Sequence, residues 1–388
     1  MKTFTPFEYL LIDVANQYGL DKKLYEQRIA WAQENLDKLE TLVDEAETPN
    51  MYWKAVDAVR CAQAGIPTGH LVGFDSAASG IQLLSVCARC VVGMMNTGVL
   101  NDDTRTGAPD IYTTATRVMN RESYVRKAVK NALMTYFYGS NAQPVATFGE
   151  GEDLQLFFNA AKQVAPEAFD LRSILVGLWN PEAYAHTWEM PDHGIVYKRV
   201  WDDEDYRIQE PLLGSSFTFR TSVNRPIEKG VSLAADVTHS IDAYLLRELN
   251  RRCNFDRETL RNALELINAM GDIHVTDRSK IVSLVEVDYL NVDTIQNYSL
   301  NQLALLKEII TLSLNAGSFE VVNVHDEFKV HPNYVNQLRK HYNKLLQEFY
   351  YSNLLAGIIK QISGLTLQVN EVNESVADKI LDADYPIN

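Results

Sequence analysis

Apolar residues recur at helical spacing through the first 64 positions of the chain. Between residues 7 and 45 they alternate with charged residues, which predicts two amphipathic helices interrupted at Tyr18-Gly19. Pro49 ends this pair, and a further helix is predicted over residues 52–64. The same spacing predicts a helix over residues 82–95. Residues 104–109 form a loop rich in helix breakers, and helices are predicted from its end to residue 138. Two more helices are predicted over residues 240–252 and 256–269. Helices are expected in most of the remaining chain.

Two apolar runs have the shorter pattern of strands, and each ends at an aspartate. Residues 70–75 predict a buried strand that ends at Asp75. Residues 321–330 have β-branched and aromatic residues on both sides of a polar centre, which predicts a tight hairpin with His325-Asp326 at its tip. Residues 194–197 and 216–220 are also strand-like. A small sheet interrupted by long helical segments indicates the α+β fold class.

The helix that ends near residue 138 carries a stripe of four residues at intervals of four. Arg126, Lys130, Met134 and Tyr138 lie on one face, and Gly139 provides the stop signal. At about 1.5 Å per residue the stripe spans roughly 18 Å, close to the length of an extended nucleoside triphosphate. The two cations at its start predict a site for phosphates, and the phenol at its end predicts a site for the base and sugar.

The two strand-end aspartates, Asp75 and Asp326, point to a metal site. Two carboxylates brought together repel each other unless a cation lies between them, and oxygen-only ligation suits Mg²⁺. A pair of Mg²⁺ ions would serve nucleotidyl transfer. Taken singly, each feature has a plainer explanation, because an aspartate at a strand end is usually a turn former. Likewise, Arg and Lys at this spacing usually form a solvated helix face. The hypothesis therefore depends on their combination.

Composition and net charge limit the number of structural units, the class of protein and the cellular location that we expect. The chain has 388 residues, 46% of them hydrophobic, which suggests two or three structural units. Its net charge of −15 is unusual for a nucleic-acid-binding protein, although basic residues cluster locally around Arg126 and Lys130. Four cysteines, including Cys87-Ala88-Arg89-Cys90, do not have zinc-site spacing and are expected to be buried thiols. The absence of a signal peptide or a membrane-length apolar run predicts a soluble, intracellular protein without membrane partners.

Together these segments resemble the single-subunit DNA-dependent RNA polymerases of bacteriophages and mitochondria. Residues 74–82, Phe-Asp-Ser-Ala-Ala-Ser-Gly-Ile-Gln, are similar to the first palm motif of that family. The stripe that ends at Tyr138-Gly139-Ser140 resembles its fingers helix, and His325-Asp326-Glu327-Phe328 resembles its second palm motif. Weaker similarities occur in the expected order at residues 15–35, 110–112, 188–192, 237–242 and 379–385.

The resemblance implies a right-hand polymerase with a mostly helical palm and fingers and a small antiparallel palm sheet. Residues 1–105 would form the first part of the palm, 106–239 the fingers, and 240–388 the rest of the palm with the C-terminal foot. It implies that Asp75, Asp326 and the Ser76 carbonyl hold two Mg²⁺ ions. The implied nucleotide-binding residues are Lys22, Arg126, Lys130, Met134, Tyr138 and Gly139. Lys130, Tyr138 and His325 would take part in catalysis, and His239 and Tyr112 would contact nucleic acid.

The product is expected to be RNA. Related DNA polymerases carry a bulky glutamate five residues after the first aspartate, which blocks a ribose 2′-hydroxyl. This chain has Gly80 there, and the phenol of Tyr138 offers a hydrogen bond near the sugar. Ribonucleoside triphosphates are therefore the expected substrates, DNA the template and RNA the product.

One family element is missing from the sequence. No Asp-x-x-Gly-Arg segment precedes the stretch at residues 15–22, nor is a promoter-binding domain recognisable. The expected explanation is a second polymerase subunit that carries the missing N-terminal half, as in heterodimeric phage RNA polymerases, with this chain as the larger, catalytic subunit. A single-stranded-DNA-binding or promoter-opening protein is a further candidate partner. The expected location is the cytoplasm of an infected bacterial host.

Two alternatives stay open at this point. A DNA polymerase of the same right-hand architecture would need an exclusion residue that Gly80 does not supply. A non-catalytic, palm-like subunit that only binds nucleic acid would not need both aspartates together with the cationic stripe.

Overall fold

A small antiparallel sheet joins two segments that lie far apart in the sequence. The computed structural model describes residues 1–121 and 124–388, and its sheet has the order β1-β7-β6. These strands are β1 (Val72–Asp75), β6 (Val322–Val324) and β7 (Glu327–Val330). The predicted strand and hairpin are therefore confirmed. Because Asp75 pairs with Glu327 and the Ser76 amide donates to the Asp326 carbonyl (3.2 Å), both aspartates lie at the same end of the paired strands β1 and β7.

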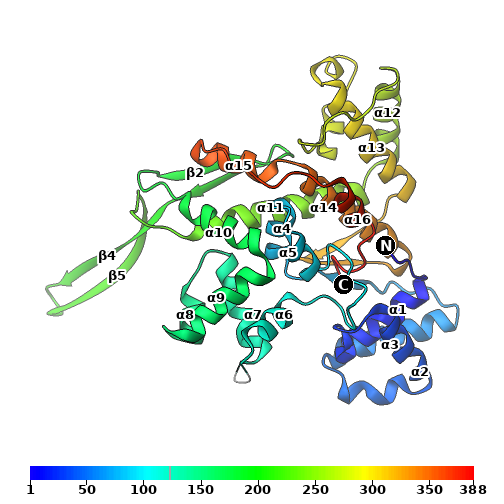
Figure 1. Cartoon of the computed structure of the whole chain (residues 1–388), viewed down its shortest axis with the longest axis horizontal. Coiled ribbons are helices and arrows are strands. Elements are labelled where there is room, and N and C mark those ends of the chain that lie inside the picture. The colour runs from blue at the N-terminus through cyan, green and yellow to red at the C-terminus, as the bar shows by residue number, and fades with distance from the viewer. Residues whose placement is uncertain (122–123) are drawn as a thin grey trace.

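The N-terminal region is a helical layer beside this sheet (Figure 1). It comprises α1 (Pro6–Ala15), a π-helical turn (Asn16–Leu20), α2 (Tyr25–Glu34), 3₁₀ turns (Leu36–Glu45) and α3 (Pro49–Gln63). The predicted interruption is confirmed at Gly19, whose φ of +110° favours glycine. Thr5 caps α1 in a reciprocal capping box with Glu8.

The helix predicted over residues 82–95 is wrong as a single element. The structure has α4 (Ser79–Cys87) and α5 (Val91–Asn96), because Arg89 takes a left-handed conformation with φ of +55°. Its guanidinium donates to backbone carbonyls, including that of Tyr350 at 2.9 Å. The Cys90 thiol then accepts the Gly93 amide and caps α5. Cys87 and Cys90 are buried free thiols, as expected, and burial raises their pKa values to about 12 and about 11.

The middle of the chain is a helical layer with two hairpins. Its helices are α6 (Ile111–Met119), α7 (Arg126–Phe137), α8 (Ala142–Phe148), α9 (Glu152–Val164), α10 (Pro166–Gly177) and α11 (Ser232–Cys253). The predicted stripe lies on α7, which ends where Gly139 adopts a φ of +100°. The hairpins are β2 (Ala185–Glu189) with β3 (Ile195–Arg199), and β4 (Trp201–Glu210) with β5 (Ser215–Asn224). The β4–β5 hairpin projects away from the body of the molecule (Figure 1).

The C-terminal part contains a second hydrophobic core. Helices α12 (Arg257–Asn268) and α13 (Leu300–Ala316), with 3₁₀ turns at Leu284–Asp288 and Ile295–Asn297, enclose this core, which is distinct from the main one. A 3₁₀ turn (Pro332–Tyr334), α14 (Val335–Tyr351), α15 (Leu354–Ser363) and α16 (Glu374–Leu381) follow. In the part of the chain that the structure describes, no helix combines the length and apolarity needed to cross a bilayer.

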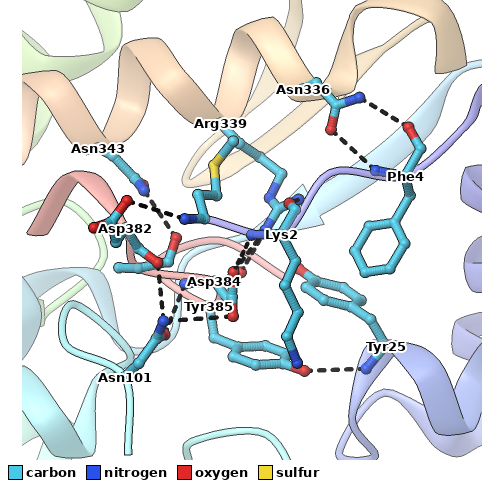
Figure 2. A network of polar contacts seen from close by, with 12 residues as sticks. Lys2, Phe4, Tyr25, Asn101, Asn336, Arg339, Asn343, Asp382, Asp384 and Tyr385 are labelled. Atoms are coloured by element: carbon cyan, nitrogen blue, oxygen red, sulfur yellow. Dashed lines mark hydrogen bonds and ion pairs between the residues drawn. The ribbon is translucent and has the colours of Figure 1, made fainter. Parts of the chain in front are cut away.

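A polar network fastens both chain ends to α14 (Figure 2). The Arg339 guanidinium donates to the carbonyls of Lys2 (2.8 Å) and Asp384 (2.9 Å). Asn343 donates to the Ala383 carbonyl at 2.8 Å, and the Tyr25 amide donates to the Tyr385 hydroxyl at 3.0 Å. This network positions the last residues of the chain beside β1.

An ion-pair cluster fixes the β2–β3 turn to α11 and yields a first prediction. Asp192 accepts from Arg247 (2.7 Å and 2.9 Å) and from Arg251 (3.0 Å). Burial alone would raise the pKa of Asp192, but the two arginines lower it to about 2 from the ordinary 3.8. The folded state therefore binds a proton at Asp192 more weakly than the unfolded state does. The stabilisation from these ion pairs is present above the ordinary pKa of an aspartate, and it is lost as the pH falls through the pKa of Asp192 in the folded state.

Asp192→Asn is expected to lower the free energy of unfolding by about 1–3 kcal/mol at neutral pH. The difference from wild type should shrink as the pH falls from about 4 toward about 2. Urea denaturation over this pH range measures it. Asp202→Asn, at an exposed pair with Arg225, is the control, with an expected cost below about 1 kcal/mol. Equal costs for the two variants would contradict the prediction.

Candidate active site

One cavity of about 330 Å³ is lined by residues from all three main motifs: the segment at residues 74–82, the stripe that ends at Tyr138, and the hairpin tip with Asp326. Its walls come from the β1–α4 turn, the β6–β7 hairpin tip, the start of α6, and α7. The residues predicted for the site that line it are Lys22, Asp75, Ser76, Gly80, Tyr112, Arg126, Lys130, Met134, Tyr138 and Asp326. The structure therefore brings together residues that are spread over most of the chain. Their chemical roles stay predictions.

The carboxylates of Asp75 and Asp326 form the acidic part of the cavity. Burial raises the pKa of Asp75 to about 6, and the charges of Asp326 and Glu327 add to this rise. The sheet register imposes this proximity, since Asp326 directly precedes the residue that pairs with Asp75. Two repelling carboxylates of this kind fit a divalent cation, which would relieve both the repulsion and the burial cost.

Two strained turns present these carboxylates. Ala78, just before α4, has φ of +69°, and His325, just before Asp326, has φ of +56°. Left-handed conformations cost non-glycine residues roughly 1–2 kcal/mol, and such strain is concentrated at functional sites. In the turn between β1 and α4, the Ser76 carbonyl accepts a hydrogen bond from the Ala78 amide at 2.9 Å. A carbonyl has two lone pairs, so this oxygen retains one for a further ligand.

The cationic part of the cavity is fixed by Asp110 and Tyr112 at the start of α6. Asp110 caps this helix and also accepts from the Arg126 Nε at 2.6 Å. Arg126 and Lys130 lie over the ring of Tyr112, at 5.6 Å and 5.5 Å from its centroid. Burial raises the pKa of this phenol. The ring of Tyr112 thus makes cation–π contacts with both side chains. The contact of Tyr112 with nucleic acid stays a prediction.

Tyr138 closes the other end of the stripe. A Cβ atom added to Gly80 would lie 2.7 Å from the Tyr138 hydroxyl, so the absent side chain is what allows the phenol to approach. Burial raises the pKa of Tyr138. Gly80 therefore determines the position of the phenol as well as leaving space for a sugar.

Three predicted site residues lie outside the lining of the cavity. His325 is exposed at the hairpin tip, and Gly139 packs against the Val231 carbonyl beyond the end of α7. His239 is exposed on α11, with its ring centroid 4.8 Å from that of Tyr138. These positions neighbour the cavity, and the predicted roles of the three residues are untested.

Several residues of the site had no clear signal in the sequence. Asp21 and Asn388 line the cavity, and the Asn388 amide and carbonyl pair with the backbone of Asp75 at 2.9 Å and 3.1 Å. Arg28 donates to the Asn388 side chain at 2.8 Å. Asp110 was part of only a weak similarity, and its partnership with Arg126 depends on how α6 and α7 pack. Sequence position alone does not predict such contacts.

The first part of the chain is similar to a known protein family. Residues 4–64 match the DNA-dependent RNA polymerase family. This segment includes Lys22 of the cavity and agrees with the resemblance to that family, while the palm and fingers motifs lie outside the matched residues. A search of curated proteins gave no match. The more specific likeness, to the larger subunit of a heterodimeric polymerase, stays a prediction.

The described residues contain no cluster of three or more His, Cys, Asp or Glu side chains arranged to hold a metal ion. The site thus offers the carboxylate pair of Asp75 and Asp326. Such a pair is suited to Mg²⁺, which binds through one or two carboxylates and completes its shell with water and substrate phosphates.

Proposed function

We propose that this chain is a DNA-directed RNA polymerase that transfers nucleotides from ribonucleoside triphosphates to a growing RNA. The family match over residues 4–64 supports the polymerase class. The observation that carries the proposal is the single cavity lined by Asp75, Asp326, Arg126, Lys130 and Tyr138. It combines a carboxylate pair with cations and a phenol, the groups needed for metal-assisted phosphoryl transfer.

Asp75, Asp326 and the Ser76 carbonyl would hold two Mg²⁺ ions in this proposal. The charge of Asp326, which contributes to the raised pKa of Asp75, supports it, because a bound cation removes the repulsion between the two carboxylates. When bound, the two ions supply Lewis-acid stabilisation of the attacking 3′-hydroxyl and of the leaving pyrophosphate.

The other residues would position and discriminate the nucleotide. Arg126, Lys130 and Lys22 bind the triphosphate, and their charges oppose the negative charge that develops on the leaving group. Met134 packs against the base, and Tyr138 recognises the ribose. His239 and His325, exposed beside the cavity, contact the template or the RNA end.

In this proposal the α+β fold is a right-hand polymerase. Residues 1–105 and 240–388 form the palm, the latter including a C-terminal foot, and residues 106–239 form the fingers. The sheet that carries both aspartates belongs to the palm, and α7 to the fingers. The closeness of Asn388 to Asp75 supports a structural role for the foot.

A second subunit with an Asp-x-x-Gly-Arg element would complete the enzyme, in the cytoplasm of an infected bacterium. The net charge of −15 supports this part of the proposal. Template and product phosphates require cations beyond Lys22, Arg126 and Lys130, and a more basic partner would supply them. A promoter-opening protein is a further proposed partner.

The function is tested by nucleotide incorporation on a primed DNA template with Mg²⁺, with and without the candidate second subunit. We expect extension of the primer with ribonucleotides. Preferential use of deoxyribonucleotides would instead identify a DNA polymerase. Template binding without any incorporation, in the presence of both subunits, would identify a non-catalytic subunit and contradict the proposal.

Tyr138→Phe is expected to raise the use of dNTPs relative to rNTPs by about five- to tenfold, since it removes one hydrogen bond made only to ribose. The measurement is the ratio of kcat/KM values for ATP and dATP. Tyr136→Phe is the matched control, because the Tyr136 ring packs among phenylalanines of the neighbouring helices. An unchanged ratio in Tyr138→Phe would show that the phenol does not select the sugar.

A further inference from the structure

Arg28 is a fully buried arginine on α2 that contacts two parts of the cavity wall. Its Nε donates to the Lys23 carbonyl at 2.9 Å, and one of its Nη atoms donates to the Asp21 carbonyl at 2.6 Å. The same Nη donates to the amide oxygen of Asn388 at 2.8 Å, and the other Nη donates to that of Asn16 at 2.9 Å. Each acceptor is a carbonyl or amide oxygen, so the guanidinium holds neutral groups of the surrounding chain in fixed positions.

These contacts fix the backbone on both sides of Lys22. Arg28 binds the carbonyls of the residues directly before and after it. The Lys22 carbonyl itself accepts from the Ala108 amide at 3.0 Å, and a Cβ atom added to Gly107 would lie 2.8 Å from that carbonyl oxygen. The Lys22 side chain, in contrast, is 52% exposed, and it lines the cavity with its ammonium 2.7 Å from the Asp21 carboxylate. The backbone of Lys22 is therefore held in place while its charge remains accessible to a ligand.

The same guanidinium connects Lys22 with the acidic part of the cavity. Asn388, whose side chain Arg28 binds, pairs with the backbone of Asp75 through two hydrogen bonds of 2.9 Å and 3.1 Å. Arg28 thus joins the turn that carries Lys22 to the strand end that carries Asp75. A planar guanidinium can bind several acceptors at once in a fixed geometry, which a lysine ammonium does not reproduce.

We propose that Arg28 is a positioning residue for the triphosphate: it holds the backbone of Lys22 at a fixed place relative to Asp75, so that the Lys22 ammonium meets the phosphates of a bound nucleotide. Preorganisation of this kind increases affinity because less order has to be created on binding. The inference rests on the proposed role of the cavity as a nucleotide site and extends it to a residue outside the lining of the cavity.

Equilibrium dialysis of radiolabelled ATP and AMP, each with Mg²⁺, against the full-length chain tests the inference. The measured quantity is the preference for ATP, the ratio of the two dissociation constants. We expect Lys22→Ala to lower this preference about tenfold or more, the effect of one lost charged hydrogen bond. Arg28→Lys should lower it about fivefold, because it displaces Lys22 without removing its charge. Adding Arg28→Lys to Lys22→Ala should cause no further loss, because Arg28 acts only through Lys22.

Arg89→Lys is the matched control. Arg89 is also buried and donates to backbone carbonyls, including those of Tyr350 at 2.9 Å and Tyr351 at 3.1 Å, which lie outside the lining of the cavity. Arg89→Lys should leave the preference for ATP unchanged. Gly107→Ala is a second test, because the added methyl group would displace the Lys22 carbonyl while Arg28 stays intact. It should also lower the preference for ATP, and it remains informative if Arg28→Lys does not fold.

A purely structural role of Arg28 gives a different result. The inference is wrong if Arg28→Lys weakens the binding of ATP and AMP equally, or if its effect persists in the Lys22→Ala background. It is also wrong if the wild-type chain binds ATP no more tightly than AMP.

The outcome is distinguishable from that of the polymerase proposal. A chain whose preference for ATP depends on Arg28, and which incorporates no nucleotide with its partner, supports the inference and overturns the polymerase. A chain that incorporates nucleotides, while Arg28→Lys keeps the full preference for ATP, overturns the inference alone.

Discussion

Asp326→Asn is expected to reduce nucleotide incorporation by about a thousandfold or more. The substitution keeps the shape of the side chain but removes a negative charge that the proposed Mg²⁺ site needs. Losing even one preorganised electrostatic contact at a reaction centre typically costs about 10²–10³ in rate, and a metal site contributes several such contacts. Primer extension with a saturating ribonucleotide, measured across a Mg²⁺ titration, gives the size of the effect.

The matching control is Asp293→Asn, at an exposed position between the 3₁₀ turns of the second core. It should leave incorporation unchanged. The substitution should not disturb the fold, because the Ser76 amide donates to the backbone carbonyl of Asp326 and not to its carboxylate. Folding is checked separately. Full activity in Asp326→Asn would refute the two-metal mechanism. Partial activity restored by higher Mg²⁺ would instead support a weakened metal site.

Arg252→Leu is expected to lower the free energy of unfolding by about 3–5 kcal/mol, the usual cost of breaking a buried ion pair from one side. Arg252 is fully buried and donates to Glu248 at 3.0 Å and to Glu348 at 2.9 Å and 2.7 Å. Glu248 also accepts from Ser283 and from the Leu284 amide, which joins α11 to the second core. Removing the guanidinium would leave the fully buried Glu248 carboxylate with only Arg251, at 3.5 Å, and would remove both charged hydrogen bonds from Glu348. Urea denaturation at neutral pH measures the loss.

Arg252→Lys keeps a charge but cannot form the paired hydrogen bonds, so it should show an intermediate loss. Arg261→Leu, on the exposed side of α12, is the control and should change stability by no more than about 0.5 kcal/mol. A loss of less than about 1 kcal/mol in Arg252→Leu would contradict this account of the network.

Local patterns were sufficient to predict the elements that carry the site. The strand ending at Asp75 and the hairpin with Asp326 at its tip depend on short-range alternation and turn preference, and both are confirmed. The helix bearing the stripe is confirmed for the same reason, since its spacing and the stop at Gly139 are local features. The single helix over residues 82–95 was wrong because Arg89 leaves the helical conformation to bind carbonyls from distant residues.

The amino-acid sequence by itself determined which residues carry charge and how they are spaced along each element. It also contains a similarity to DNA-dependent RNA polymerases, whose family model matches residues 4–64. Only the tertiary structure decided which residues these contact: Asp110 with Arg126, Asn388 with Asp75, and the Tyr138 hydroxyl against Gly80. Such contacts depend on how whole helices pack against one another. The pattern of residues within one helix does not specify which helix packs against it, so these contacts could be identified only from the tertiary structure.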